Sequence, residues 1–236
     1  MAYLNGEERS SYVQDMFSEI SDHYDFMNRI MTMGQDMRWR REVVQLACLD
    51  SSSRLLDLGT GTGDLARLAL QKHPGLQITA ADFTFDMMRI GRIGIDSDIC
   101  WLSADALHLP FMDNTFDAIV SGFLLRNLDD ISVSLIDQYR ILVPGGKIVT
   151  LDTTPPQNNL LRPFIRFYFH TIVPLLGRMI IHQSEAYHYL PDSTEMFLQP
   201  EKLADLFRSA GFVQVGFRRL MFGTVAIHWG EKPIDA

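Results

Sequence analysis

A glycine-rich segment at residues 54–64 constrains the fold of this chain more than any other feature of its sequence. It reads RLLDLGTGTGD, an apolar run followed by glycines at positions 59, 61 and 63. The apolar run predicts a buried strand, and the glycines predict a tight turn into a helix. Glycines at a helix N-terminus let backbone N–H groups approach a bound molecule closely. The segment therefore predicts a strand, a turn and a helix that together bind a small ligand.

The charges beside these glycines restrict the ligand. A dinucleotide-binding loop spaces its glycines as Gly-x-Gly-x-x-Gly, and this loop does not. Asp57 and Asp64 flank the turn, and their negative charge would repel a diphosphate but suits an ammonium or a sulfonium. S-adenosylmethionine is a ligand of that kind. We expect its methionine end to lie among Asp57, Gly59, Thr60, Gly61 and Gly63.

Two further carboxylates follow the next predicted strands. Asp82 lies 19 residues past Gly63, where a carboxylate can accept hydrogen bonds from both hydroxyls of a ribose. Its alternative role is to cap a helix that begins near Thr84. Asp105 and Ala106 follow the third predicted strand, where they would meet the edge of an adenine. Because parallel strands end at one edge of a sheet, these positions predict a single binding site.

Other side chains near the same edge complete the expected site. Phe83 and Met87 would flank the adenine, and Ser121 could reach the methionine portion. The carboxylate of the methionine would otherwise lie among acidic residues, so we expect Arg38 or Arg41 to pair with it. Both arginines could equally be exposed charges on a helix.

Apolar runs alternate with helical stretches along most of the chain. The predicted strands cover 53–58, 77–82, 99–103, 116–122 and 146–152, and the helices between them cover 64–72, 84–93 and 130–142. This alternation predicts a Rossmann-like, mostly parallel sheet with helices on both faces. A helix at 201–210 and strands at about 212–220 and 223–230 predict a closing antiparallel hairpin. We expect a seven-stranded α/β fold in a single domain that covers residues 1–236.

Two segments lie outside this predicted sheet. Residues 11–49 form an amphipathic helical cap, and residues 155–199 form a helical insertion or lid. The core of the insertion, residues 160–183, is apolar but interrupted by arginines, and its longest charge-free run has 11 residues. A membrane span needs about 20. The insertion therefore fits a helix packed on the domain, a lid over an apolar substrate, or a surface that rests on a membrane.

Composition and charge narrow the class of protein. The net charge is −8 and hydrophobic residues make up 47% of the chain, which is typical of a globular protein and argues against a nucleic-acid surface. Cys48 and Cys100 lie far apart in apolar surroundings, so we expect buried thiols in a reducing compartment. Residues 1–9 lack the apolar core of a signal peptide, which favours the cytoplasm. The sequence contains no pattern typical of a metal site.

Several blocks of the chain resemble the C-methyltransferases of ubiquinone and menaquinone biosynthesis. The most specific are YDFMN at 24–28, LRN at 125–127 and YLPDS at 189–193, in that order. The glycine loop is shared with a much wider superfamily of methyltransferases. The chain departs from the family at Val143, Asp152 and Thr154, where lysine, glutamate and serine are more usual, and at Leu124, where a glycine is more usual.

This resemblance implies methyl transfer from S-adenosylmethionine to a ring carbon of a polyprenyl quinol. It implies that Arg126 and Asn127 hold a water molecule or the quinol oxygens, that Arg126 stabilises a phenolate, and that Tyr24 closes over the site. Each residue also has a simpler interpretation. Arg126 could be a surface charge, Tyr24 a packed aromatic, and Asn127 could share with Asp129 the capping of a helix near residue 130.

Two other functions are compatible with the same residues. The acceptor could be another small aromatic or lipid molecule that is methylated on oxygen or nitrogen. The chain could also be a non-catalytic module that keeps the cofactor loop and uses residues 155–199 as a membrane or partner surface. The expected partners are a lipophilic quinol, a membrane surface through residues 160–183, a second copy of the chain in a homodimer, and no nucleic acid.

Overall fold

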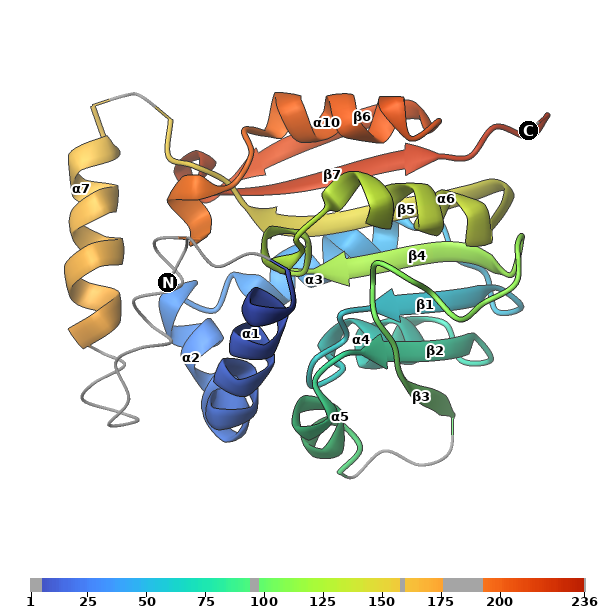
Figure 1. Cartoon of the computed structure of the whole chain (residues 1–236), viewed down its shortest axis with the longest axis horizontal. Helices are drawn as coiled ribbons and strands as arrows, with labels where there is room; N and C mark the ends of the chain where they lie inside the picture. Colours follow the sequence, from blue (N-terminus) through green and yellow to red (C-terminus); the bar gives the residue numbers. More distant parts are fainter. Residues whose placement is uncertain (1–5, 94–97, 158–159, 176–192, 236) are drawn as a thin grey trace.

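A single seven-stranded sheet organises the chain (Figure 1). The structure, a computed structural model, describes residues 6–93, 98–157, 160–175 and 193–235. The strands run in the order β3-β2-β1-β4-β5-β7-β6 across the sheet. Their bounds are β1 Arg54–Leu58, β2 Gln77–Asp82, β3 Ile99–Ser103, β4 Phe116–Gly122, β5 Leu142–Thr153, β6 Val213–Leu220 and β7 Val225–Glu231.

The pairing of the strands confirms the predicted fold class. Strands β1 to β5 pair in parallel, whereas β7 pairs antiparallel with both β5 and β6. The chain order reverses between β1 and β4, because β2 and β3 lie on one side of β1 and the later strands lie on the other. Such a reversal opens a crevice at the carboxyl ends of the strands, where ligands of doubly wound sheets bind.

Helices cover both faces of the sheet, and each face has its own apolar core. One core packs α3 and α4 against the sheet, with Val43, Leu55 and Ala66 fully buried. The other packs α6 and α10, with Leu56 and Leu135 fully buried. Leu55 and Leu56 are neighbours in β1, so alternate side chains of this strand serve opposite faces. The helices are α3 Asp36–Leu46, α4 Asp64–Lys72, α5 Phe85–Gly91, α6 Ile131–Ile141 and α10 Pro200–Ser209.

The start of β5 differs from the predicted boundary. The expected helix ends at Ile141, and β5 begins directly at Leu142, four residues before the predicted start. The pairing of β4 with β5 shifts register between Phe116 and Ala118, so residues 143–146 form a bulge in the sheet. Proline and glycine in this segment therefore mark a bulge at the start of β5, which is another position where strands accept these residues.

The N-terminal segment forms a helical cap at the carboxyl ends of the parallel strands (Figure 1). It consists of α1 Glu7–Ile20, the short helical turn η1 Ser21–His23, α2 Tyr24–Met31 and then α3. Met16, Ile20 and Met27 bury an apolar cluster within this cap, and Val173 from the insertion packs into it. The cap therefore contacts both the sheet and the insertion.

The described part of the insertion contains α7 Arg162–Phe167 and the helical turn η3 Tyr168–Ile172. In Figure 1 α7 stands at the left, apart from the sheet and its covering helices. Tyr168 anchors the segment, because its hydroxyl donates a hydrogen bond to the Met31 carbonyl at 3.1 Å. Residues 176–192 lie outside the described part of the chain. The surface predicted at residues 160–183 is therefore described only over residues 160–175. In the described residues, no helix is long and apolar enough to cross a membrane.

The two cysteines do not occupy the buried positions that we expected. Both Cys48 and Cys100 are free and exposed. Cys48 lies in a turn after α3 with a positive φ of 51°, and its Sγ is 3.3 Å from Lys147 Nζ. Cys100 sits on β3, the edge strand of the sheet, where one face of the strand meets solvent. The prediction of burial was wrong because apolar neighbours in sequence do not show which face of an edge strand is covered.

Candidate active site

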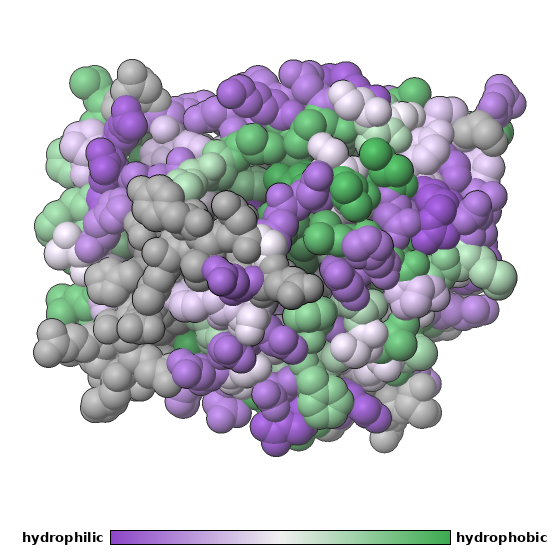
Figure 2. All heavy atoms as spheres, viewed as in Figure 1, coloured by the Kyte–Doolittle hydropathy of each residue, from purple (hydrophilic) through white to green (hydrophobic). Residues whose placement is uncertain are grey.

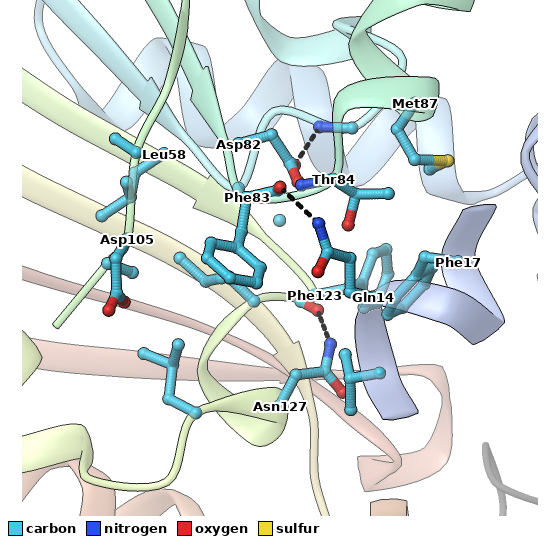
Figure 3. Close-up of a pocket in the computed structure, with 18 of the residues that line it drawn as sticks. Gln14, Phe17, Leu58, Asp82, Phe83, Thr84, Met87, Asp105, Phe123 and Asn127 are labelled. Carbon is cyan, nitrogen blue, oxygen red and sulfur yellow. Dashed lines mark hydrogen bonds between the residues drawn. The ribbon is translucent and has the colours of Figure 1, made fainter. Parts of the chain in front are cut away.

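A pocket lies where the reversal of strand order predicts it, beneath α1 and at the carboxyl ends of β1, β2 and β4 (Figure 3). It is a partly open cleft with about 130 Å³ of interior space. Its lining comprises Val13, Gln14, Phe17, Tyr24, Leu58, Gly59, Gly61, Asp82, Phe83, Thr84, Met87, Ala104, Asp105, Ala106, Leu107, Gly122, Phe123, Leu124, Asn127, Leu128 and Asp129.

The glycine loop forms the floor of this pocket. Gly59, Gly61 and Gly63 have φ values of 66°, 56° and 85°, a region that other residues adopt only with strain. Gly59 and Gly61 line the pocket, as predicted. Gly63 does not line it, because it packs under Trp101, whose ring would lie 2.6 Å from an added Cβ. The structure therefore gives the third glycine a role in close packing, outside the pocket lining.

Asp57 braces the loop from below and does not line the pocket. It is 1% exposed, and its Oδ2 accepts hydrogen bonds from Thr60 Oγ1 at 2.7 Å and from the Ala66 N–H at 3.0 Å. Burial raises the pKa of this carboxyl to about 6. Asp57 and Thr60 were predicted to contact the ligand. In the structure both support the loop through Asp57 Oδ2, and the buried Oδ1 has no hydrogen-bond partner among the described residues. Contact of Asp57 or Thr60 with the ligand stays a prediction.

Asp57 makes stability depend on pH in a direction opposite to that of a salt-bridged carboxylate. Its folded pKa lies above its unfolded value of 3.8, so the folded state binds the proton more tightly and loses stability as pH rises from about 4 to 6. An Asp57→Asn variant removes this titration. Between pH 4 and pH 7, we expect its unfolding free energy to fall by about 2 kcal/mol less than that of the native chain. Denaturant titrations across this range, without ligand, measure the difference, and parallel curves would contradict the assignment.

Asp82 combines the two roles that the sequence left open. Its Oδ1 accepts the Thr84 N–H at 2.8 Å, which caps α5, and its Oδ2 accepts the Gly61 N–H at 2.7 Å. The same carboxylate lines the pocket (Figure 3), and each oxygen keeps a second lone pair for a ligand hydroxyl. Burial raises its pKa. Contact with a ribose stays a prediction that this geometry permits.

The residues expected around the adenine lie together in the pocket. Phe83 projects its ring into it, Met87 lies near the start of α5, and Asp105 stands on the opposite side from Met87 (Figure 3). Asp105 Oδ1 accepts the Leu107 N–H at 2.9 Å, which fixes the turn that also places Ala106 in the lining. The structure therefore brings all four of these predicted residues to one cavity.

Two predicted contacts fall away from the pocket. Ser121 is 2% exposed, and its Oγ lies 2.7 Å from Thr150 Oγ1 on the neighbouring strand. This hydroxyl is therefore hydrogen-bonded inside the sheet, and Ser121 does not line the pocket. Arg38 lies exposed on α3 and does not line the pocket, and Arg41 is exposed on the same helix. Neither arginine is placed to bind the carboxylate of a ligand.

The turn after β4 carries backbone strain inside the pocket. Phe123 has a φ of 63°, an unusual value for a bulky residue and one that clusters at functional sites. Its N–H donates to the Leu151 carbonyl at 2.6 Å, and its carbonyl accepts a hydrogen bond from Asn127 Nδ2 at 3.1 Å (Figure 3). Asn127 therefore supports this turn and does not cap α6, whose cap is Asp130.

Arg126 is buried next to this turn and is not a surface charge. It is 5% exposed, and its Nη1 donates to Asp152 Oδ1 at 2.8 Å. The backbone N–H of Arg126 donates to the other oxygen of Asp152 at 3.2 Å. Its guanidinium also lies 5.2 Å from the centre of the Phe123 ring, which lines the pocket. Asp152 appeared in the sequence only as a departure from the family pattern, and its tertiary pairing could not be read there.

Tyr24, the first residue of α2, brings the helical cap into the pocket lining. It lines the pocket and packs edge-on against Phe17, with ring centres 5.7 Å apart. Burial raises the pKa of its hydroxyl, and the positive charge of Arg126 acts in the opposite direction. Tyr24 is thus both a packed aromatic and a pocket residue, close enough to Arg126 for the two to interact electrostatically.

A network of ion pairs fastens the cap to the glycine loop. Asp64, the first residue of α4, lies 3.3 Å from Arg29 and 3.6 Å from Arg40. Both arginines also reach the fully buried Asp36, at 2.7 Å and 3.0 Å. Asp25 accepts a hydrogen bond from Thr62 Oγ1 at 2.7 Å. These contacts join α2 and α3 to the loop, so the cap and the pocket floor form one unit.

Helix α1 supplies pocket residues that the sequence analysis did not find. Val13, Gln14 and Phe17 line one wall, and Gln14 Nε2 donates to the Phe83 carbonyl at 3.3 Å (Figure 3). The only sequence signal was the helical periodicity of the cap, which shows that a face is buried but not what it faces.

Comparison with known proteins shows to which protein family the chain belongs. A model of the ubiE/COQ5 methyltransferase family matches residues 5–232. The chain belongs to this family. It is 51% identical to the ubiquinone/menaquinone biosynthesis C-methyltransferase UbiE of Desulfotalea psychrophila, over 93% of this chain and 90% of that protein. It is 42% identical to the demethylmenaquinone methyltransferase of Thermus thermophilus, over 92% of this chain and 100% of that protein.

A solved structure agrees with the fold of this ubiE/COQ5 methyltransferase family member. A phosphoethanolamine N-methyltransferase of Haemonchus contortus, solved with S-adenosylhomocysteine, aligns with a TM-score of 0.62 at 16% identity. The alignment covers 80% of this chain and 51% of that one. The predictions of the family, of the seven-stranded methyltransferase fold and of an enzyme that uses S-adenosylmethionine are confirmed.

The pocket fits this methyl donor on its own geometry. Gly61 has no side chain to crowd the pocket, since an added Cβ would lie 3.3 Å from Cε of Met87, another lining residue. The carboxylates of Asp82 and Asp105 face the cavity near the exposed ring of Phe83, a set suited to ribose hydroxyls, an adenine amino group and an adenine face. Which of these residues bind the donor stays a prediction.

Proposed function

We propose that the enzyme methylates a ring carbon of a polyprenyl quinol, and that this quinol is demethylmenaquinol. The observation that carries the proposal is the buried Arg126–Asp152 pair. Arg126 does not itself line the pocket, but its guanidinium lies over the ring of Phe123 and its charge acts on Tyr24, and both of these residues are in the lining. The relatives from Desulfotalea psychrophila and Thermus thermophilus are named for the same chemistry. Together these features favour an acceptor whose oxygen becomes negatively charged.

The chemistry explains why a buried cation is needed. The bound donor supplies a methyl group on a positively charged sulfur. A ring carbon becomes a strong enough nucleophile when the neighbouring phenolic oxygen loses its proton. Arg126 can stabilise the resulting phenolate, because a cation in a low-dielectric site acts strongly on developing charge. A new carbon–carbon bond forms, the sulfur–carbon bond breaks, and the ring carbon then releases its proton to solvent.

The pocket walls suit an apolar acceptor. Phe17, Leu124 and Leu128 contribute apolar side chains on the side of the cap and of the turn after β4. Alignment of the ring carbon with the methyl group in a dry pocket supplies much of the acceleration in reactions of this type. Asn127 orients the turn that carries Arg126, and Tyr24 closes the pocket above it.

Transfer of labelled methyl groups tests the proposal. The enzyme is incubated with labelled S-adenosylmethionine and with chemically reduced demethylmenaquinone or a benzoquinol analogue, and mass spectrometry locates the new methyl group. Methylation of a ring carbon of the naphthoquinol supports the proposal. Methylation on oxygen or nitrogen, or of neither quinol while the donor still binds, would move the function to another acceptor or to a non-catalytic binding module.

We also propose that α7 and its flanks rest on an anionic membrane surface. Leu160, Phe164 and Phe167 are 93%, 72% and 60% exposed, and Arg162 and Arg166 lie among them on the same helix. Figure 2 shows apolar and charged residues side by side at the left edge, where α7 lies. Apolar side chains with interleaved arginines are typical of helices that lie in a membrane interface.

Sedimentation with vesicles measures this contact. Replacing Phe164 and Phe167 by serine should reduce the fraction bound to vesicles that contain anionic lipid at least fivefold, because two aromatic rings no longer enter the interface. A matched variant, Val133→Ser and Ile136→Ser on the exposed face of α6, should bind like the native chain. Equal loss in both variants, or no binding by the native chain, contradicts the proposal. The predicted homodimer is tested separately by sedimentation velocity.

A further inference from the structure

Arg40 holds a buried guanidinium with an unused donor beside the pocket. The residue is 5% exposed. Its Nη1 donates to Asp36 Oδ2 at 3.0 Å, and its Nε lies 3.6 Å from Asp64 Oδ2. Among the described residues its Nη2 has no hydrogen-bond partner. Nη2 is not fully buried either, so a ligand can reach this donor.

The surroundings of Arg40 place it at the loop side of the pocket. Its guanidinium lies 5.6 Å from the centre of the Phe123 ring, a lining residue. Burial raises the pKa of Tyr24, which lines the pocket, and of Asp57, which lies beneath the glycine loop, and the charge of Arg40 opposes both shifts. Arg40 therefore sits near Gly59 and Gly61, and not among the residues that frame the expected adenine site.

The end of the pocket beside the glycine loop is acidic, so an anionic group bound there needs a cation as its partner. The amino-acid part of S-adenosylmethionine carries an ammonium and a carboxylate. Asp25, Asp57 and Asp64 surround the loop and suit the ammonium and the sulfonium, but they would repel the carboxylate. Arg38 and Arg41 are exposed on the far side of α3. We propose that Arg40 binds the methionine carboxylate of the methyl donor through its guanidinium.

A purely structural role does not account for Arg40. Arg29 already pairs with Asp36 at 2.7 Å and with Asp64 at 3.3 Å, so both carboxylates have a second cation. Arg40 adds a guanidinium whose Nη2 has no hydrogen-bond partner among the described residues and stays open to a ligand. A charge-assisted hydrogen bond to a carboxylate is strong in such surroundings.

Calorimetric binding of two adenosine ligands tests the proposal without any quinol. S-adenosylhomocysteine carries the carboxylate, and 5′-methylthioadenosine lacks the whole amino-acid part. An Arg40→Gln variant should bind S-adenosylhomocysteine roughly 10- to 100-fold more weakly than the native chain. Its affinity for 5′-methylthioadenosine should change less than twofold, and Arg40→Lys should fall between. Equal losses for the two ligands, or no loss for either, would overturn the proposal.

Two controls keep the experiment decisive. Arg41→Gln removes the same charge from an exposed position of the same helix and should leave both affinities unchanged. If Arg40→Gln does not fold, the native chain and Arg40→Lys are compared on S-adenosylhomocysteine and its decarboxylated analogue. The native chain should prefer the carboxylate roughly 10- to 100-fold, and Arg40→Lys should prefer it less. No preference in the native chain overturns the proposal, and neither result depends on which acceptor the enzyme methylates.

Discussion

An Arg126→Met variant is expected to bind S-adenosylmethionine like the native enzyme while its turnover on the quinol falls roughly 100- to 1,000-fold. The guanidinium lies beside Phe123 and donates to Asp152 Oδ1, and the backbone N–H of Arg126 donates to Asp152 Oδ2, outside the ring of residues that frames the donor. Loss of its charge therefore affects the phenolate that forms on the acceptor. Calorimetry measures donor binding, and labelled methyl transfer at saturating quinol measures turnover.

A second variant separates this effect from loss of structure. Arg126→Met leaves the 1% exposed Asp152 as a buried charge without its partner, which destabilises a protein by about 3–5 kcal/mol. Adding Asp152→Asn removes that charge, so the double variant should recover stability but not turnover. As a matched control, Arg54→Met breaks a half-exposed pair with Asp117 at the other end of β1 and should keep full turnover. Normal turnover in the double variant would refute the role of Arg126.

The Asp82→Asn variant should lose donor affinity roughly 100-fold, because three sets of interactions depend on the carboxylate. It accepts the Gly61 N–H and the Thr84 N–H, and we expect it to accept the ribose hydroxyls as well. An asparagine offers one acceptor and one donor, so it cannot serve both N–H groups. Each charge-assisted bond contributes about 1.5–3 kcal/mol.

The ribose contact is isolated by changing the ligand. A 2′-deoxy analogue of S-adenosylhomocysteine should bind the native chain at least 10-fold more weakly than the parent compound. The Asp82→Asn variant should discriminate between them much less. Asp86→Asn, which removes a neighbouring carboxylate paired with Arg89 at 3.5 Å, serves as the control. If the native chain bound both ligands equally, Asp82 would be only a cap and a brace for the loop.

The positions of most strands could be predicted from the sequence, because the residues that mark a strand and its end are neighbours in the chain. The predicted bounds of β1 to β4 come from apolar runs that end near glycine or aspartate, and each bound agrees with the structure within one residue. Residues directly after those ends, such as Asp82 and Asp105, lie in the pocket because parallel strands share one edge. The start of β5 was wrong because Pro144 and Gly145 are compatible with both a helix stop and a bulge.

Roles that depend on tertiary contacts were not accessible in the same way. Asp57 and Ser121 lie at the predicted strand ends, but Asp57 Oδ2 accepts the Ala66 N–H and the Ser121 hydroxyl pairs with Thr150, which no local pattern shows. The buried arginine of α3 could have been found from helical phase. Arg40 shares a face with Val43, Val44 and Ala47 at spacings of three, four and seven residues, whereas Arg38 and Arg41 lie on the other face.

Phe123 brings one aromatic ring into contact with two positive charges. The guanidiniums of Arg40 and Arg126 both lie over this ring, with their central carbons 5.6 Å and 5.2 Å from its centre. An aromatic ring attracts cations, so the strained residue 123 holds near the pocket two guanidiniums that otherwise repel each other. In our proposal, the same side chain therefore joins the carboxylate site of the donor to the phenolate site of the acceptor.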